Sequence, residues 1–215
     1  MPQTSPFRRL RAAFAVAVAP VGSPNNMAVD PNVVAQLHAQ MKVLDRDPYL
    51  HVADQRLGVL SVFDDLKFDR ADIDMMTPAM RQHAITKLEP LGFRQRSGNV
   101  MEHEETGIRL IIPKFHTQGA SPFDITRYTP KRAQDIYLLT PTQTACQFID
   151  SYVRDDAVER IKTLIAKHPI NLYRLMDYLE NKPTHDAFQS VIGHLKYVQR
   201  EAVEGEPLQR RRALG

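Results

Sequence analysis

Residues 136–141 read Ile-Tyr-Leu-Leu-Thr-Pro, and they mark the point where the chain changes from mixed structure to helices. Ile136 to Leu139 form a short apolar run, which is typical of a buried strand. Thr140 then suits a helix N-cap, and Pro141 suits the first helical position. Strands and helices are predicted before this point and only helices after it. The fold class that follows is α+β.

Four amphipathic helices are predicted after Leu139, because apolar residues recur there at helical spacing. Pro169 separates the second helix from the third, and Pro183 opens the fourth. The segment that contains these four helices is long enough for a small helical bundle. We therefore expect a C-terminal helical subdomain over 140–205.

The chain before residue 140 predicts a small mixed sheet with flanking helices. Helices are expected over 31–45 and 77–89, because each begins with a capping residue followed by proline. A strand is expected at 56–63, and a hairpin or meander at 93–113. Together these elements form an α/β core over 27–139.

The two ends of the chain are basic and lie outside this fold. Residues 1–26 carry three arginines and an apolar run, which suits a disordered extension or a signal-like targeting segment. Residues 206–215 form a basic tail with three more arginines. The net charge of +3 thus comes mainly from the ends and says little about whether the folded surface attracts nucleic acid.

The composition is that of an ordinary globular protein, with 43% hydrophobic and 25% charged residues. Cys146 is the single cysteine, so no intramolecular disulfide can form. No apolar stretch approaches the roughly 20 residues that cross a bilayer. We therefore expect a cytoplasmic protein without membrane partners.

Asp72-Ile73-Asp74 is the sharpest candidate for chemistry. Alternate residues of a strand point the same way, so both carboxylates would face one side. Two such carboxylates repel unless a cation lies between them, and oxygen ligands suit Mg²⁺. Asp72 and Asp74 are therefore the candidate catalytic residues and metal ligands for nucleotidyl transfer. The alternative is a solvated loop before a helix, with one acid near the helix dipole.

The order of elements around this triplet resembles the nucleotidyltransferase superfamily, especially the toxins of abortive-infection toxin–antitoxin systems. That family has a hydrophobic-Gly-Gly/Ser element, then Asp-x-Asp/Glu on a strand, then a third acid on a later strand. Leu57-Gly58 stands at the first element, which makes Gly58 a cofactor-binding candidate. The resemblance covers roughly residues 50–180. It implies transfer of NMP from an NTP to an RNA or protein acceptor, with Mg²⁺ as cofactor.

Two positions depart from the family pattern. Val59 stands where the family has a second small residue, which helps the nucleotide phosphates to approach the backbone. Arg109 stands on the strand where the third acid is expected. An active enzyme and a degenerate relative without transferase activity therefore both stay open.

The segment over 109–132 combines basic residues with aromatics. Its five bases face a single acid, and three aromatic residues lie among them. Such a combination suits phosphates and stacked bases, although an ordinary solvated loop is an equal alternative. The candidate phosphate- or nucleic-acid-binding residues are Arg109, Lys114, Arg127, Lys131 and Arg132.

Three functional interpretations follow. The first is a nucleotidyltransferase-like protein, active or degenerate, that works in a toxin–antitoxin system beside an antitoxin or other partner protein. It requires Asp72 and Asp74 to share one cleft with a third acid. The second is a non-catalytic regulatory module that binds nucleic acid or protein, which requires the basic residues from Lys114 to Arg132 to share one face. The third is a purely structural protein.

Overall fold

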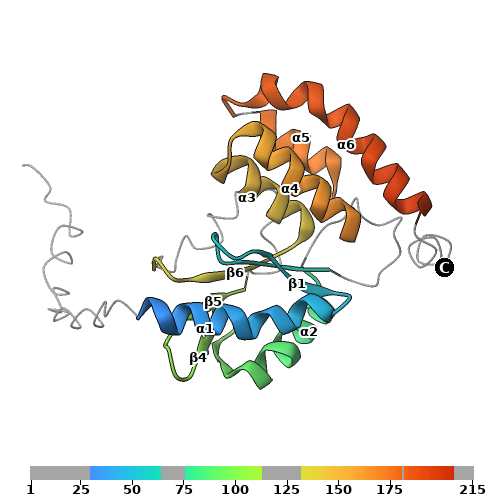
Figure 1. The fold of residues 1–215 in the computed structure, drawn as a ribbon. Helices are drawn as coiled ribbons and strands as arrows, with labels where there is room; N and C mark the ends of the chain where they lie inside the picture. The colour runs from blue at the N-terminus through green and yellow to red at the C-terminus, as the bar shows by residue number, and fades with distance from the viewer. Residues whose placement is uncertain (1–29, 64–75, 113–131, 181, 206–215) are drawn as a thin grey trace, which may run out of the picture. The chain divides into compact units, whose positions relative to one another are not determined.

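The computed structural model describes residues 30–63, 76–112, 132–180 and 182–205. The chain divides into two units, Met1–Asp30 and Pro31–Gly215. Every helix and strand described below belongs to the second unit, in which helices flank a mixed six-stranded sheet (Figure 1). The predicted α+β class is thereby confirmed.

The sheet has the strand order β1-β2-β6-β5-β4-β3. β6 lies between β2 and β5 and runs parallel to both, whereas all other neighbours pair antiparallel. The strand predicted at 136–139 is therefore the strand that joins two antiparallel halves. The strands are β1 (Leu50–Asp54), β2 (Val59–Val62), β3 (Phe93–Ser97), β4 (Val100–His103), β5 (Arg109–Ile111) and β6 (Ile136–Leu139).

Two helices and two short 3-10 turns lie on one side of the sheet (Figure 1). Thr77 caps the second helix, because its hydroxyl accepts a hydrogen bond from the Met80 amide at 3.2 Å. The helices predicted over 31–45 and 77–89 are confirmed, each with a final turn of 3-10 geometry. The elements are α1 (Pro31–Met41), η2 (Lys42–Arg46), α2 (Pro78–Leu88) and η4 (Glu89–Leu91).

Four helices cover the opposite side of the sheet (Figure 1), as predicted for the C-terminal third. Thr140 caps the first of them, accepting from the Gln143 amide at 3.3 Å. Their apolar faces share one core, and Ala53 and Leu57 pack against that core from the sheet side. Within the described ranges, no helix has the length and apolarity that crossing a membrane requires. The four are α3 (Pro141–Ser151), α4 (Arg154–Lys167), α5 (Leu172–Glu180) and α6 (His185–Gly205).

The strand predicted at 56–63 is shorter in the structure, because it begins only at Val59. The preceding residues form a turn, in which the Leu57 amide donates to Asp54 Oδ1 at 2.9 Å. β1, on the other side of this turn, lies outside the predicted strands. Its sequence carries His51 and Asp54, two polar residues that obscure the apolar pattern although both are buried.

Candidate functional site

Five of the predicted site residues lie outside the described part of the chain. The common cleft for the two aspartates and the common basic face therefore stay predictions. The structure does place the other three candidates, Gly58, Arg109 and Arg132. The residues outside the described ranges are Asp72, Asp74, Lys114, Arg127 and Lys131.

Gly58 lies in the turn between β1 and β2. Its φ is +62°, and a Cβ added there would lie 3.0 Å from the backbone oxygen of Asp135. Its own carbonyl accepts a hydrogen bond from the Tyr137 amide at 2.7 Å. Only glycine combines this left-handed backbone with so close an approach. The geometry of the turn therefore accounts for a glycine at position 58. A role of Gly58 in cofactor binding stays a prediction.

Gly58→Ala should lower the free energy of unfolding by about 1–3 kcal/mol, because alanine meets both the left-handed backbone and the Asp135 carbonyl. Urea denaturation measures this change. Gly98→Ala is the matched control, since a Cβ added at Gly98 meets no atom within 4 Å. Equal stabilities of the two variants would contradict the steric explanation.

Arg109 and Asp135 form a buried ion pair at the start of β5 and β6. Arg109 Nε donates to Asp135 Oδ1 at 2.9 Å, and Nη2 donates to Oδ2 at 2.6 Å. The two side chains are 11% and 1% exposed. The Arg132 amide donates to the same carboxylate at 2.8 Å, while Arg132 itself is exposed. This bidentate pairing gives Arg109 a structural partner inside the protein.

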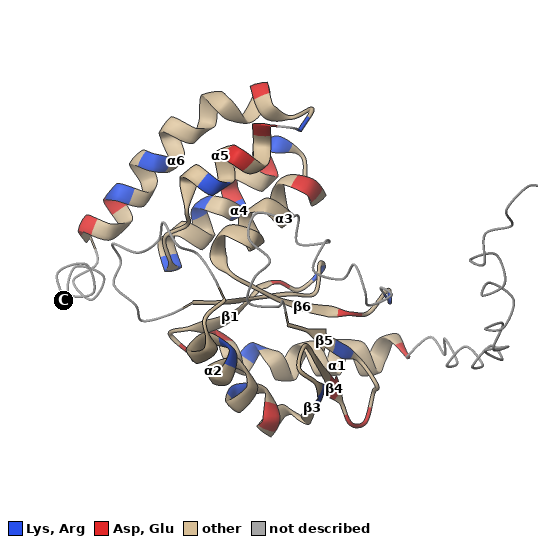
Figure 2. Cartoon of the chain, turned by 180° about the vertical axis from the view of Figure 1, so that it is seen from behind, with Lys and Arg blue, Asp and Glu red and all other residues tan. Residues whose placement is uncertain are grey.

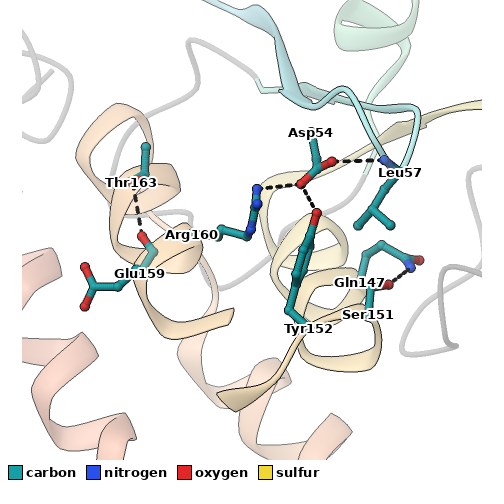
Figure 3. A network of polar contacts seen from close by, with 8 residues as sticks. All are labelled: Asp54, Leu57, Gln147, Ser151, Tyr152, Glu159, Arg160 and Thr163. Atoms are coloured by element: carbon teal, nitrogen blue, oxygen red, sulfur yellow. Dashed lines mark hydrogen bonds and ion pairs between the residues drawn. The ribbon is translucent and has the colours of Figure 1, made fainter. Parts of the chain in front are cut away.

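Asp54 is a second buried carboxylate, at the end of β1 (Figure 3). It accepts hydrogen bonds from the Leu57 amide at 2.9 Å, the Tyr152 hydroxyl at 2.5 Å and Arg160 Nη1 at 2.6 Å. Burial, and then the hydrogen bond to Asp54, raise the pKa of Tyr152, so its hydroxyl remains a donor. This network ties the sheet to α4 and to the end of α3.

Two guanidinium groups lie over the ring of Tyr152. The Cζ atoms of Arg56 and Arg160 lie 4.4 Å and 4.0 Å from the ring centroid, so they are no more than 8.4 Å apart. Arg56 comes from the exposed turn after β1, whereas Arg160 comes from α4. A cation over an aromatic face is favourable. The arrangement therefore brings two positive groups close together beside a single carboxylate, Asp54.

A cavity of about 170 Å³ lies next to this network, between β1, α3 and α4. We name it the β1–α4 pocket. Among its lining residues, His51 and Phe148 are buried, at 4% and 2% exposure. Arg160, Thr163 and Lys167 also line it and are exposed. Their spacing of three and four residues places them on one face of α4.

Among the residues that the structure describes, the lining of the β1–α4 pocket carries Arg160 and Lys167 and no acidic side chain. Lys167 forms no ion pair with any residue that the structure describes. Burial, with smaller contributions from Lys167 and His168, lowers the pKa of His51 to about 3, so its imidazole is neutral at pH 7. Such a pocket attracts anions.

Ser61 adds a buried hydroxyl beside the floor of this pocket. It is the direct cross-strand partner of His51 in the β1–β2 ladder, so the two side chains project from the same face of the sheet. Its Oγ has no hydrogen-bond partner among the residues with assigned positions. The His51 ring likewise forms no hydrogen bond to another described residue. Of these two groups, only His51 lines the pocket and is therefore available to a ligand there.

Elsewhere the charges are mixed, because basic and acidic residues are interspersed over the helices (Figure 2). The positive character of the β1–α4 pocket is therefore local. No group of three or more His, Cys, Asp or Glu side chains that could hold a metal occurs within the described ranges. The prediction of Mg²⁺ thus continues to rest on Asp72 and Asp74.

The chain matches no protein-family model, no curated protein and no solved structure. The likeness to nucleotidyltransferases therefore stays a prediction. None of the pocket residues was among the predicted site residues. The one sequence signal that could have indicated them is the polar face of α4, on which Arg160, Thr163 and Lys167 recur at helical spacing.

Proposed function

We propose that this protein is a non-catalytic module that binds single-stranded nucleic acid at the β1–α4 pocket and the arginines beside it. The proposal is carried by one observation: Arg160 and Lys167 both line this pocket, and none of its described lining residues is acidic. Lysine and arginine groups that contact phosphates supply most of the affinity of non-specific nucleic-acid binding.

The size of the pocket favours one phosphate group over a whole nucleotide. Its volume is about 170 Å³, whereas pockets that enclose entire small molecules usually measure about 300–1,000 Å³. The rest of the ligand must then lie on the surface outside the pocket. A polynucleotide meets this condition, because each phosphate is attached to a larger chain.

Arg56 extends the positive surface beyond the pocket. It is exposed, and its Cζ lies within 8.4 Å of that of Arg160 across the Tyr152 ring. Guanidinium planes contact neighbouring phosphates and also stack against unpaired bases. A single strand can therefore place one phosphate between Arg160 and Lys167 and an adjacent phosphate or base on Arg56.

Lys167→Ala should weaken binding of a labelled single-stranded oligonucleotide about tenfold at low salt, since it removes a charge that pairs with one phosphate. It should also reduce the slope of log affinity against log salt by about 0.7, the value for one phosphate contact on a single strand. Fluorescence anisotropy with RNA and with DNA of the same sequence measures both quantities.

Lys162→Ala is the control for this experiment. Lys162 lies on the same helix but pairs with Glu159 at 2.7 Å and does not line the pocket. Its affinity and salt slope should equal those of the wild type. Equal losses in the two lysine variants would remove the pocket from the proposal, and absence of binding by the wild type would overturn the proposal itself.

Nucleotidyl transfer is a second candidate function, supported by the order of the elements. α2 begins at Pro78, shortly after Asp74, and the β3–β4 hairpin follows it. The resemblance to nucleotidyltransferases implies this succession. In this version Asp72 and Asp74 hold Mg²⁺ and an NTP, and the acceptor is an RNA or protein hydroxyl.

In this second candidate, Asp74→Ala should reduce label transfer from an NTP by about 100-fold or more, because a Mg²⁺ ligand is lost. The assay follows incorporation of labelled NMP into RNA or protein with Mg²⁺ present. Asp156→Ala is the control, since Asp156 is an exposed acid on α4. Transfer that is equal in wild type and Asp74→Ala would remove the enzymatic candidate.

A further inference from the structure

The β1–α4 pocket has a buried floor and a charged, exposed rim. Phe148 and Leu164 line it and belong to the core of the helical layer, at 2% and 3% exposure. His51, at 4% exposure, lines it from the sheet. Arg160 and Lys167 stand at the exposed side. A ligand that enters between these two cations meets the protein core and cannot continue through it.

The volume of this pocket fits the end of a ligand. About 170 Å³ is well below the roughly 300–1,000 Å³ of pockets that enclose whole small molecules. One phosphate group with its oxygens fits into this space. An internal phosphodiester carries a chain on both sides, so it reaches the buried floor of this pocket poorly, whereas a phosphate monoester carries a chain on one side only.

The charges favour a monoester for a second reason. A phosphate monoester carries a charge of about −1.5 to −2 at pH 7, and an internal diester carries −1. Arg160 shares its charge with Asp54, at 2.6 Å, but Lys167 has no described ion-pair partner. His51 is neutral, because its pKa is lowered to about 3, so it can donate one N–H without adding charge.

From this geometry we infer that the β1–α4 pocket binds the terminal phosphate monoester of a nucleic-acid strand. Lys167 and Arg160 pair with the phosphate charge, and the His51 imidazole donates a hydrogen bond from the floor. The inference rests on the proposed function, because it names the part of the nucleic acid that this same site recognises. The ligand class is a strand with a 5′- or 3′-phosphate.

The test compares oligonucleotides of one sequence that differ only at their ends. The full chain is titrated, with anisotropy as readout, against strands with a 5′-phosphate, a 3′-phosphate or two hydroxyl ends, each as RNA and as DNA. One phosphorylated end should bind about tenfold tighter than the hydroxyl-ended strand, as expected for an added charge-assisted contact. The end that gains affinity identifies the direction in which the strand lies.

Two variants locate the effect. Lys167→Ala changes an exposed residue and His51→Gln changes the floor, and each should reduce the tenfold preference to about twofold or less. His194→Gln, an exposed residue of α6, should retain the full preference. Because Lys167 is exposed, its variant tests the inference even where His51→Gln does not fold.

The outcomes separate this inference from the proposed function. Equal affinity for phosphorylated and hydroxyl ends would overturn the inference and leave nucleic-acid binding intact. A preference that survives Lys167→Ala would place the terminal phosphate elsewhere and would also overturn it. Absence of binding to every oligonucleotide would overturn the proposed function itself.

Discussion

Asp135→Ala should lower the free energy of unfolding by about 3–5 kcal/mol, the usual cost of removing one partner of a buried ion pair. The Arg109 side chain is only 11% exposed, so its guanidinium would lose the Asp135 carboxylate without gaining much water. The Arg132 amide would lose its acceptor as well. Urea denaturation with an unchanged m-value measures the loss.

Asp155→Ala is the matched control for Asp135→Ala. Asp155 also pairs with an arginine, Arg154, at 2.8 Å, but the two side chains are 82% and 49% exposed. Exposed pairs contribute about 0–1 kcal/mol, so this variant should retain nearly all of the wild-type stability. Similar losses in the two aspartate variants would show that burial does not set the strength of the Asp135 pair.

A double-mutant cycle extends the same experiment to Arg109. If Arg109 stabilises the sheet through Asp135, then Asp135→Ala and Arg109→Ala are non-additive, with a coupling energy of about 1–3 kcal/mol. Oligonucleotide affinity of folded Arg109→Ala should then equal that of the wild type. A loss of affinity without coupling to Asp135 would instead support the predicted phosphate-binding role of Arg109.

Asp54→Ala should lower the free energy of unfolding by about 2–4 kcal/mol, because two partly buried donors lose their acceptor. The Leu57 amide and the Tyr152 hydroxyl each bond to this carboxylate, and an unsatisfied buried donor costs about 1–3 kcal/mol. Loss of the ion pair with Arg160 adds less to this cost in stability, since the Arg160 side chain is 42% exposed and remains in contact with water. Thermal and urea unfolding both measure the change.

Tyr152→Phe separates the parts of this network. It removes a single hydrogen bond to Asp54, worth about 1 kcal/mol, and keeps the ring under the two arginines. The stability loss should therefore be clearly smaller than for Asp54→Ala, with Asp54→Asn between them because an amide oxygen still accepts from one donor. A Tyr152→Phe loss as large as that of Asp54→Ala would contradict the central position of the carboxylate.

The local features of the fold were predictable, because they depend on residues close in sequence. Thr77 and Thr140 each precede a proline, and both hydroxyls cap the helices that follow. The apolar run at 136–139 alone predicts the strand that the structure has there. β1 does not follow from its own sequence, because its buried Asp54 bonds to Tyr152 and Arg160, about 100 residues away.

The candidate site was less predictable for the same reason. His51 and Lys167 meet only after β1 packs beside α4, and no spacing along the sequence encodes that contact. The sequence predicts Arg109 as a basic residue on a strand, but its partner Asp135 lies 26 residues further on. Periodicity predicts which face of an element is buried, not which other element covers that face.

The central place of β6 has a consequence for how the chain acquires its fold. Among the described strands β6 is synthesised last, yet it lies between β2 and β5, so β2 gains this neighbour only when Val59 pairs with Tyr137. Until then both halves of the sheet expose an open edge, and pairing over such a separation is slow. A nascent chain interrupted before residue 136 would thus expose the unpaired edges of β2 and β5, which favour aggregation. Pairing of β6, Ile-Tyr-Leu-Leu, with both strands removes these edges.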